Sequence, residues 1–92
     1  MLKKRLFKIR NKLDRLDNEL LKLIKKRTLL VDQVLKNKKY KKEIIDNQRI
    51  KKILRNISKK SKKNKIDIIL TNKIWKSMIR AYIDYEFRMF KK

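Results

Sequence analysis

The sequence predicts an all-α protein with three helices per chain, one long, one short and one medium. The 92 residues contain no Gly and no Pro, whereas tight β-hairpins favour residues that tolerate positive φ. Apolar residues instead recur at spacings of three and four, which is the period of a helix rather than that of a strand. At this length we expect a single domain over residues 1–92.

The composition excludes many kinds of chemistry. There are 31 Lys and Arg against 9 Asp and Glu, which gives a net charge of +22. Because Cys and His are absent, zinc fingers, disulfide scaffolds, Cys nucleophiles and Ser-His-Asp triads are ruled out. The absence of Gly removes glycine-rich phosphate loops and dinucleotide fingerprints. Any reaction must therefore use Arg, Lys, Asp, Glu, Tyr, Ser or Thr.

Membrane and export signals are missing from the sequence. The longest apolar runs, such as residues 68–70, are far shorter than the roughly 20 residues that span a bilayer. Residues 1–5 are basic, but no apolar stretch follows them, so we expect no signal peptide. These features predict a cytoplasmic protein that does not contact a membrane.

Residues 2–38 are predicted to form one long helix with a heptad seam. Such a helix would be about 55 Å long, whereas a compact chain of this size has a radius of gyration of about 12 Å. One chain cannot cover the apolar stripe of this helix, so we expect a dimer. The seam consists of Leu2, Leu6, Ile9, Leu13, Leu16, Leu20, Leu23, Leu30 and Val34.

Arg27 interrupts this seam, and Lys38 falls within about 20° of the same face. Burying two cations without an anionic partner is costly. Two explanations remain open, a polar residue that sets the register of a coiled coil or a pocket for an anionic ligand. Arg10 lies about 100° from Arg27 around the helix, so in a dimer it could reach the pocket of the partner chain.

A short second helix is predicted after a connector over residues 39–45. Asp46 is a suitable N-cap, and Arg49 lies in the first turn, where a cation opposes the helix dipole. Arg49 is therefore either a ligand-binding residue or an exposed residue of no consequence. Residues 58–65 are interpreted as a solvated helix end and loop.

The third helix is predicted to begin after Asp67, which can serve as its N-cap, and to run to about Phe90. Glu86 lies one turn after Tyr82 on one flank of this helix and is either an ordinary surface acid or a ligand-facing group. The expected apolar seam consists of Leu70, Ile74, Met78, Ala81 and Tyr85, with Trp75, Ile79 and Tyr82 beside it.

Taken in order, these segments resemble the type II, all-helical chorismate mutases. Residues 9–17 (IRNKLDRLD) and 20–27 (LLKLIKKR) are similar to the opening pattern of that family. Lys38 matches its active-site lysine, residues 46–49 (DNQR) resemble the start of its second helix, and residues 74–86 resemble its closing helix. The resemblance covers nearly the whole chain.

The resemblance implies an intertwined homodimer with two equivalent active sites, each built from both chains. The implied reaction is the Claisen rearrangement of chorismate to prephenate, on the route to phenylalanine and tyrosine. This concerted, unimolecular reaction needs no nucleophile, metal or other cofactor, so we expect none. A protein without His, Cys or Gly can carry it out.

The resemblance also implies which cations hold the substrate. Arg27, Lys38 and Arg49 of one chain, with Arg10 of the partner chain, would surround the two carboxylates of chorismate. Arginine forks bind carboxylates bidentately and would fix a reactive conformer. Lys38 would stabilise the negative charge that builds on the ether oxygen as the C–O bond breaks.

Four further positions match or depart from the family pattern. Asp46 would contact the ring hydroxyl region, and Tyr82 stands where many members have Ser. Glu86 stands where the family has Gln or, in some members, Glu facing the ether oxygen; we expect its carboxyl to be neutral, since only the protonated form donates a hydrogen bond. Ile50 replaces a Glu that usually contacts the substrate hydroxyl.

Three rival functions remain open. A basic helical dimer that binds nucleic acid would account for the charge, but a one-faced basic stripe is expected for phosphate binding, and the lysines occupy nearly every polar position. We therefore do not expect a nucleic-acid partner. A helical protein–protein adaptor would leave Arg27 and Lys38 unexplained. The third rival is an inactive relative of the mutases.

Overall fold

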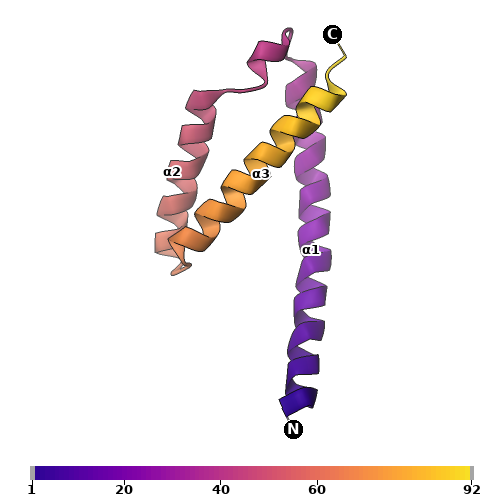
Figure 1. Ribbon diagram of the computed structural model, residues 1–92, viewed down its shortest axis with the longest axis vertical. Coiled ribbons are helices and arrows are strands. Elements are labelled where there is room, and N and C mark those ends of the chain that lie inside the picture. The colour runs from indigo at the N-terminus through magenta and orange to yellow at the C-terminus, as the bar shows by residue number, and fades with distance from the viewer. Residues whose placement is uncertain (1, 92) are drawn as a thin grey trace. The chain divides into compact units, whose positions relative to one another are not determined.

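The computed structural model describes residues 2–91 and is all-helical over that range (Figure 1). The elements, in order, are α1 (Leu2–Lys36), the short 3-10 helix η1 (Lys41–Glu43), α2 (Asn47–Lys63) and α3 (Ile68–Met89). No strand occurs among these residues, which confirms the predicted all-α class with a long, a short and a medium helix. The chain divides between Val34 and Leu35 into two structural units.

Helix α1 is continuous over 35 residues and ends at Lys36, two residues before the predicted end. The backbone N–H of Lys38 donates to the carbonyl of Leu35 at 3.1 Å and closes the last turn. The apolar seam is largely uncovered in the single chain, since its side chains are between 47% and 61% exposed. No helix in residues 2–91 has the length and apolar character to cross a bilayer. The exposed seam residues are Leu6, Ile9, Leu13, Leu16, Leu20, Leu23, Leu30 and Val34.

Both predicted N-caps are confirmed. Asp46 accepts a hydrogen bond from the backbone N–H of Arg49 at 3.0 Å, and Asp67 accepts one from that of Leu70 at 3.0 Å. Each cap satisfies a backbone donor that the helix leaves unpaired in its first turn and stabilises the helix by about 1 kcal/mol. These two caps therefore determine where α2 and α3 begin.

Residues 58–65 form a helix end and a turn, as predicted, since α2 ends at Lys63, but two serines of this stretch are not solvated. Ser61 is buried, and its hydroxyl lies 2.8 Å from that of Thr71 on α3. The hydroxyl of Ser58 donates to the side chain of Asn72 at 3.2 Å. The reason is positional: Ser61 follows Ile57 by one turn and shares its apolar face, so the serine points toward α3 rather than into water.

The turn from α2 to α3 uses a left-handed residue without glycine. Lys65 has a φ of 57°, a conformation that costs a side-chain-bearing residue about 1 kcal/mol. It is held by two backbone hydrogen bonds, from Ile66 to the Ser61 carbonyl at 2.8 Å and from Lys65 to the Lys62 carbonyl at 3.1 Å. This pairing is the Schellman pattern that ends many helices, and it lets α3 turn back along α2 (Figure 1).

The predicted apolar seam of α3 is withdrawn from solvent only in part. Leu70 is 54% and Ile74 46% exposed, and Ala81 is exposed too. Thr71 is buried and meets Ser61, so the hydroxyl contact sets the rotation of α3. Glu86 is buried as well, and Met78 and Tyr85 of the predicted seam are half-buried. The other half-buried side chains of α3 are Ile68, Asn72, Trp75, Ile79, Tyr82 and Ile83.

Candidate active site

A buried ion pair joins two distant parts of the chain. The ammonium of Lys38 lies 3.5 Å from Oε1 of Glu86, and the two side chains are only 16% and 9% exposed. Both residues belong to the unit that begins at Leu35. The pair therefore brings together two of the residues that sequence analysis placed at the substrate.

The backbone around Lys38 fixes the position of its ammonium. Lys38 follows α1 directly, and its Nζ also donates to the carbonyl of Ile44 at 3.5 Å. Leu35 and Ile44, on either side along the chain, are the buried hydrophobic residues of the described chain. The lysine side chain thus extends between an apolar anchor before it and another after it, and its charged end is held between two oxygens.

Glu86 is buried in the last part of α3, with 6% of the residue exposed. An ionised carboxyl in such a place is costly unless a cation or hydrogen-bond donors compensate it. Lys38 supplies that cation. The separation of 3.5 Å is at the outer limit of a hydrogen bond, so electrostatic attraction accounts for most of the contact.

Asp46 and Arg49 lie together at the start of α2, where the cap hydrogen bond joins them. Both side chains are exposed. One carboxylate oxygen of Asp46 is engaged by the helix, and Arg49 belongs to the first turn of α2. Ile50, the next residue, is half-buried on the side of α2 that faces α3.

Tyr82 is half-buried one helical turn before Glu86. Its ring meets that of Tyr85 edge to face, with centroids 6.2 Å apart and planes at 84°. Aromatic pairs favour this geometry. This aromatic pair lies within one helical turn of Glu86 on α3.

Arg10 and Arg27 belong to the other structural unit, on α1. Arg10 is exposed and Arg27 is half-buried. The structure therefore brings together two pairs of predicted site residues, both in the unit that begins at Leu35. These pairs are Lys38 with Glu86 and Asp46 with Arg49.

One group of the site was missed by sequence reasoning, namely the carbonyl of Ile44. Backbone acceptors carry no sequence signal of their own. Ile44 and Ile45 are, however, the aliphatic residues of a connector otherwise rich in charge. These two aliphatic residues mark the point where the connector packs against the rest of the unit, since Ile44 is buried.

Residues 9–87 match the family model described as chorismate mutase type II. The chain belongs to the type II chorismate mutase family. All seven candidate residues, from Arg10 to Glu86, fall within the matched range, and so does the Lys38–Glu86 pair. Neither the curated proteins nor the solved structures provide a match to this mutase-family chain.

The buried pair predicts a strong effect on stability. Lys38→Met leaves the Glu86 carboxyl buried without its cation, so we expect a loss of about 3 kcal/mol in the free energy of unfolding, measured with urea at fixed protein concentration. Adding Glu86→Gln should recover part of that loss. As a control, Lys22→Met removes the exposed Lys22–Glu19 pair, whose side chains are 72% and 67% exposed, and should cost less than about 1 kcal/mol. Equal losses for both lysines would contradict the assignment.

Proposed function

We propose that the chain is an active chorismate mutase, an isomerase that converts chorismate to prephenate by Claisen rearrangement. The observation that carries this proposal is the family match over residues 9–87. The buried cation within that range adds chemical support, because the reaction places new negative charge on an ether oxygen. The physiological role that follows is a step toward phenylalanine and tyrosine.

Lys38 is the residue that we assign to the breaking C–O bond. Its ammonium is held by Glu86 and by the Ile44 carbonyl, each at 3.5 Å, so little reorganisation is needed when charge develops. Preorganised donors of this kind make the largest single contribution to the rate enhancement of many enzymes. An acceleration of about 10⁶-fold requires about 8 kcal/mol of differential stabilisation, which a set of cations in a dry pocket can supply without acid–base chemistry.

The arginines are assigned to the two carboxylates of chorismate. In this proposal Arg27 and Arg49 bind from one chain and Arg10 from the partner chain, while Asp46 contacts the ring hydroxyl region and Tyr82 lines the pocket. Bidentate contacts to both carboxylates would hold the side chain over the ring in a reactive conformer. The chain's charge of +22 would also attract the dianionic substrate.

The site is complete only in a homodimer, which we propose as the active form. The seam of α1 remains about half exposed in the single chain, and contiguous apolar surface of this extent marks an interaction site. Pairing that buries the seam of one α1 against a second chain would remove this surface from water. In the proposed dimer Arg10 of the partner chain would contribute to the pocket, in keeping with the angle of about 100° that separates Arg10 from Arg27 around α1.

The central test is the disappearance of chorismate, followed by absorbance with purified protein. We expect saturable conversion to prephenate, which Arg27→Ala abolishes and Lys38→Met lowers by about 10²–10³-fold in kcat, as for loss of one oxyanion donor. Lys60→Ala, which removes an exposed lysine of α2, should retain activity. Conversion no faster than background by a folded, dimeric protein would refute the proposal and leave the inactive relative.

The ion pair and the proposed reaction require different states of Glu86. In the structure its carboxylate lies 3.5 Å from the Lys38 ammonium, whereas in the reaction only a neutral group would donate a hydrogen bond to the ether oxygen, and an ionised carboxylate would repel the charge that develops there. Glu86→Gln supplies an amide that donates without a charge, so this variant should keep or raise kcat in the chorismate assay. A loss of activity as large as that of Lys38→Met would show that the carboxylate itself is required, as the partner that positions Lys38.

If the seam of α1 is the dimer interface, a single charge added to the seam should disrupt the dimer. Leu16→Lys should convert the protein to monomers and abolish activity, as measured by analytical ultracentrifugation and the chorismate assay. Asn18→Lys adds the same charge about 200° away around α1 and should leave the dimer intact. If both variants sediment like the wild type, the seam of α1 is not the dimer interface.

A further inference from the structure

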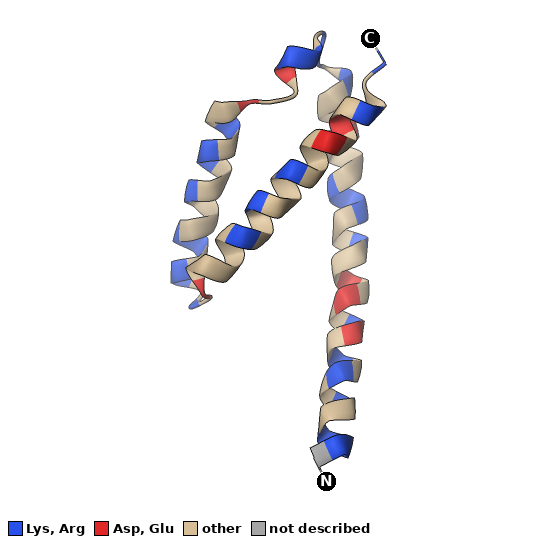
Figure 2. Ribbon diagram, viewed as in Figure 1, with Lys and Arg blue, Asp and Glu red and all other residues tan. Residues whose placement is uncertain are grey.

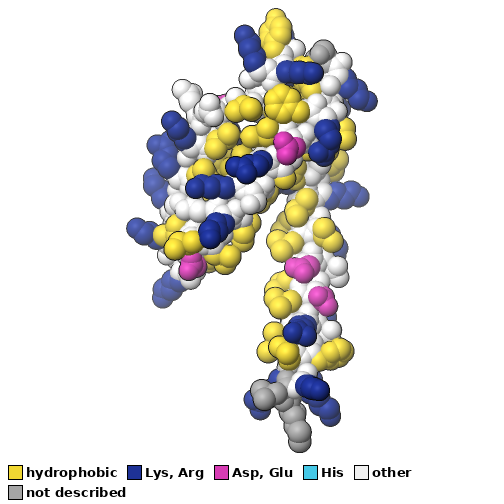
Figure 3. Space-filling view, viewed as in Figure 1, with side chains coloured by type: hydrophobic (Ala, Val, Ile, Leu, Met, Phe, Trp, Pro, Cys, Tyr) yellow, Lys and Arg dark blue, Asp and Glu magenta, His cyan; other side chains and the backbone are white. Residues whose placement is uncertain are grey.

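Lys38 differs from the other lysines of the chain in how it is held. Only 16% of its side chain is exposed, whereas every other lysine that the structure describes is classed as exposed. In the space-filling view, Lys and Arg side chains stand out from the surface (Figure 3), as expected for long side chains that keep their charge in water. The surroundings of Lys38 must therefore replace the contacts that its ammonium loses with water.

Two oxygens receive the Lys38 ammonium, and both contacts are long. Its Nζ lies 3.5 Å from Oε1 of Glu86 and 3.5 Å from the carbonyl oxygen of Ile44. Strong hydrogen bonds from an ammonium are about 2.8 Å long, so neither contact alone is short enough to fix the ammonium. The position of the ammonium depends on how firmly the rest of the structure holds these two oxygens.

The carbonyl of Ile44 is held by the side chain and the backbone of the same residue. Ile44 is 3% exposed, which makes it the most deeply buried of residues 3–91. Its backbone N–H donates to the carbonyl of Lys41 at 3.0 Å, and the N–H of Glu43 donates to the carbonyl of Tyr40 at 3.0 Å. These two bonds close the 3-10 turn η1 directly before Ile44. The carbonyl of Ile44 therefore follows the buried side chain rather than moving freely with the connector.

Ile44 is the anchor of the whole connector between Lys38 and α2. Residues 39–43 are all exposed, and Ile45, the next residue, is 47% exposed although it has the same side chain. Removal of apolar surface from water stabilises a buried isoleucine far more than a half-exposed one. The connector is thus fixed to the unit at one side chain, and the ammonium of Lys38 lies against the carbonyl of that residue.

We propose that Ile44 is a positioning residue, whose buried side chain holds its carbonyl against the Lys38 ammonium and so sets the rate of the chemical step. This inference rests on the proposed function, in which Lys38 acts at the breaking C–O bond. Ile44 has no contact with substrate in this assignment and acts through Lys38. A donor that is already in place needs no reorientation as charge develops, and a misplacement of about 1 Å can lower a rate by about 10²-fold.

A purely structural role for Ile44 predicts a different result. Loss of a buried side chain lowers stability, but the molecules that remain folded would keep the kcat of the wild type. The positioning role instead predicts a lower kcat with little change in KM, because the carboxylates of the substrate are assigned to arginines outside the connector. A loss of kcat at constant KM is the sign of an interaction made only in the transition state.

The kinetic test compares Ile44→Ala with Ile45→Ala in the chorismate assay. We expect Ile44→Ala to lower kcat by about 10–10²-fold and to change KM by less than about twofold. Ile45→Ala makes the same change at the exposed neighbour and should leave both constants unchanged. If circular dichroism shows that Ile44→Ala is unfolded, Ile44→Val decides in its place, with an expected fall in kcat of about threefold.

A stability control separates positioning from general loosening of the fold. Thr71→Ala removes the buried hydroxyl contact with Ser61 at a point about 22 Å along α3 from Glu86. This variant should lower stability in urea but keep the kcat of the wild type. Equal falls in kcat for Thr71→Ala and Ile44→Ala would overturn the positioning role.

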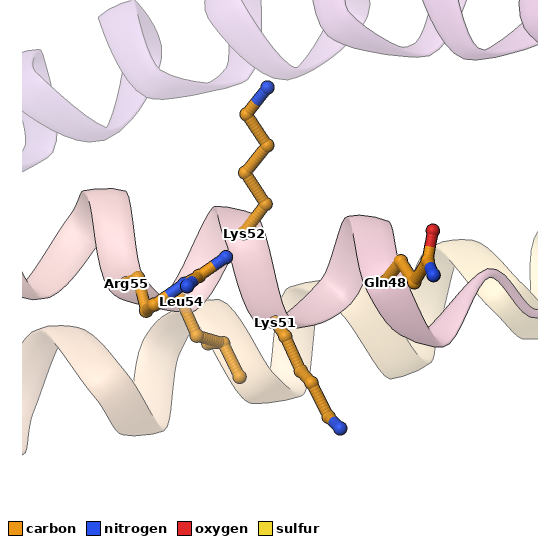
Figure 4. Close-up of a pocket in the computed structure, with 5 residues that line it drawn as sticks. All are labelled: Gln48, Lys51, Lys52, Leu54 and Arg55. Atoms are coloured by element: carbon orange, nitrogen blue, oxygen red, sulfur yellow. The ribbon is translucent and has the colours of Figure 1, made fainter.

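A second test does not depend on activity. Acetylation of the intact dimer by an N-hydroxysuccinimide ester, followed by mass spectrometry, measures how accessible each lysine is. Helix α2 carries eight Lys and Arg and no acid (Figure 2), and its exposed Lys51 and Lys52, which point in different directions (Figure 4), serve as references. We expect Lys38 to react at least about threefold more slowly than these references. This protection should be lost in Ile44→Ala and kept in Ile45→Ala.

The two tests distinguish failure of this inference from failure of the proposed function. No conversion of chorismate by the folded wild-type dimer would refute the proposed function, and the kinetic role of Ile44 with it. Conversion by the wild type with an unchanged kcat in the folded Ile44 variant would overturn the positioning role alone. Protection of Lys38 that is the same in this variant as in the wild type would also overturn it.

Discussion

The need to compensate a buried carboxyl organises the second structural unit. Glu86 is withdrawn from water near the end of α3, and its partner Lys38 is 48 residues away along the chain. For the ammonium to reach the carboxyl, α1 must end before Lys38 and the connector must turn Ile44 inward. The end of α1, the 3-10 turn and the final part of α3 are therefore tied to a single electrostatic contact.

Helix α2 shows how a strongly basic sequence still packs. Its apolar residues and Ser61 lie toward one side, and its eight cations occupy the remaining surface. The hydroxyl of Ser61 is satisfied by the Ile57 carbonyl at 2.6 Å and by Thr71 at 2.8 Å. Such a contact gives a definite rotation to a helix pair that apolar packing alone, with few fully buried side chains, would define poorly.

Much of this fold could be predicted from the sequence, because its main determinants are local. Helical periodicity and the capping residues Asp46 and Asp67 specified three helices, and family similarity predicted that Lys38 and Glu86 are site residues. Burial could not be predicted in the same way. Ser61 lies among lysines and looks solvated until its position on the apolar face is considered. The contact of Lys38 with Glu86 depends on the path of the connector, which no periodic pattern encodes.

The short α2–α3 connection implies an order of events when the chain folds. Only four residues separate the two helices, so their mutual contacts close small loops and carry a small entropic cost. Contacts of this local kind form quickly. The Lys38–Glu86 contact closes a much longer loop and gains little until α3 is in place. We therefore expect the helical hairpin to form early in folding and the charged pair to assemble on it late.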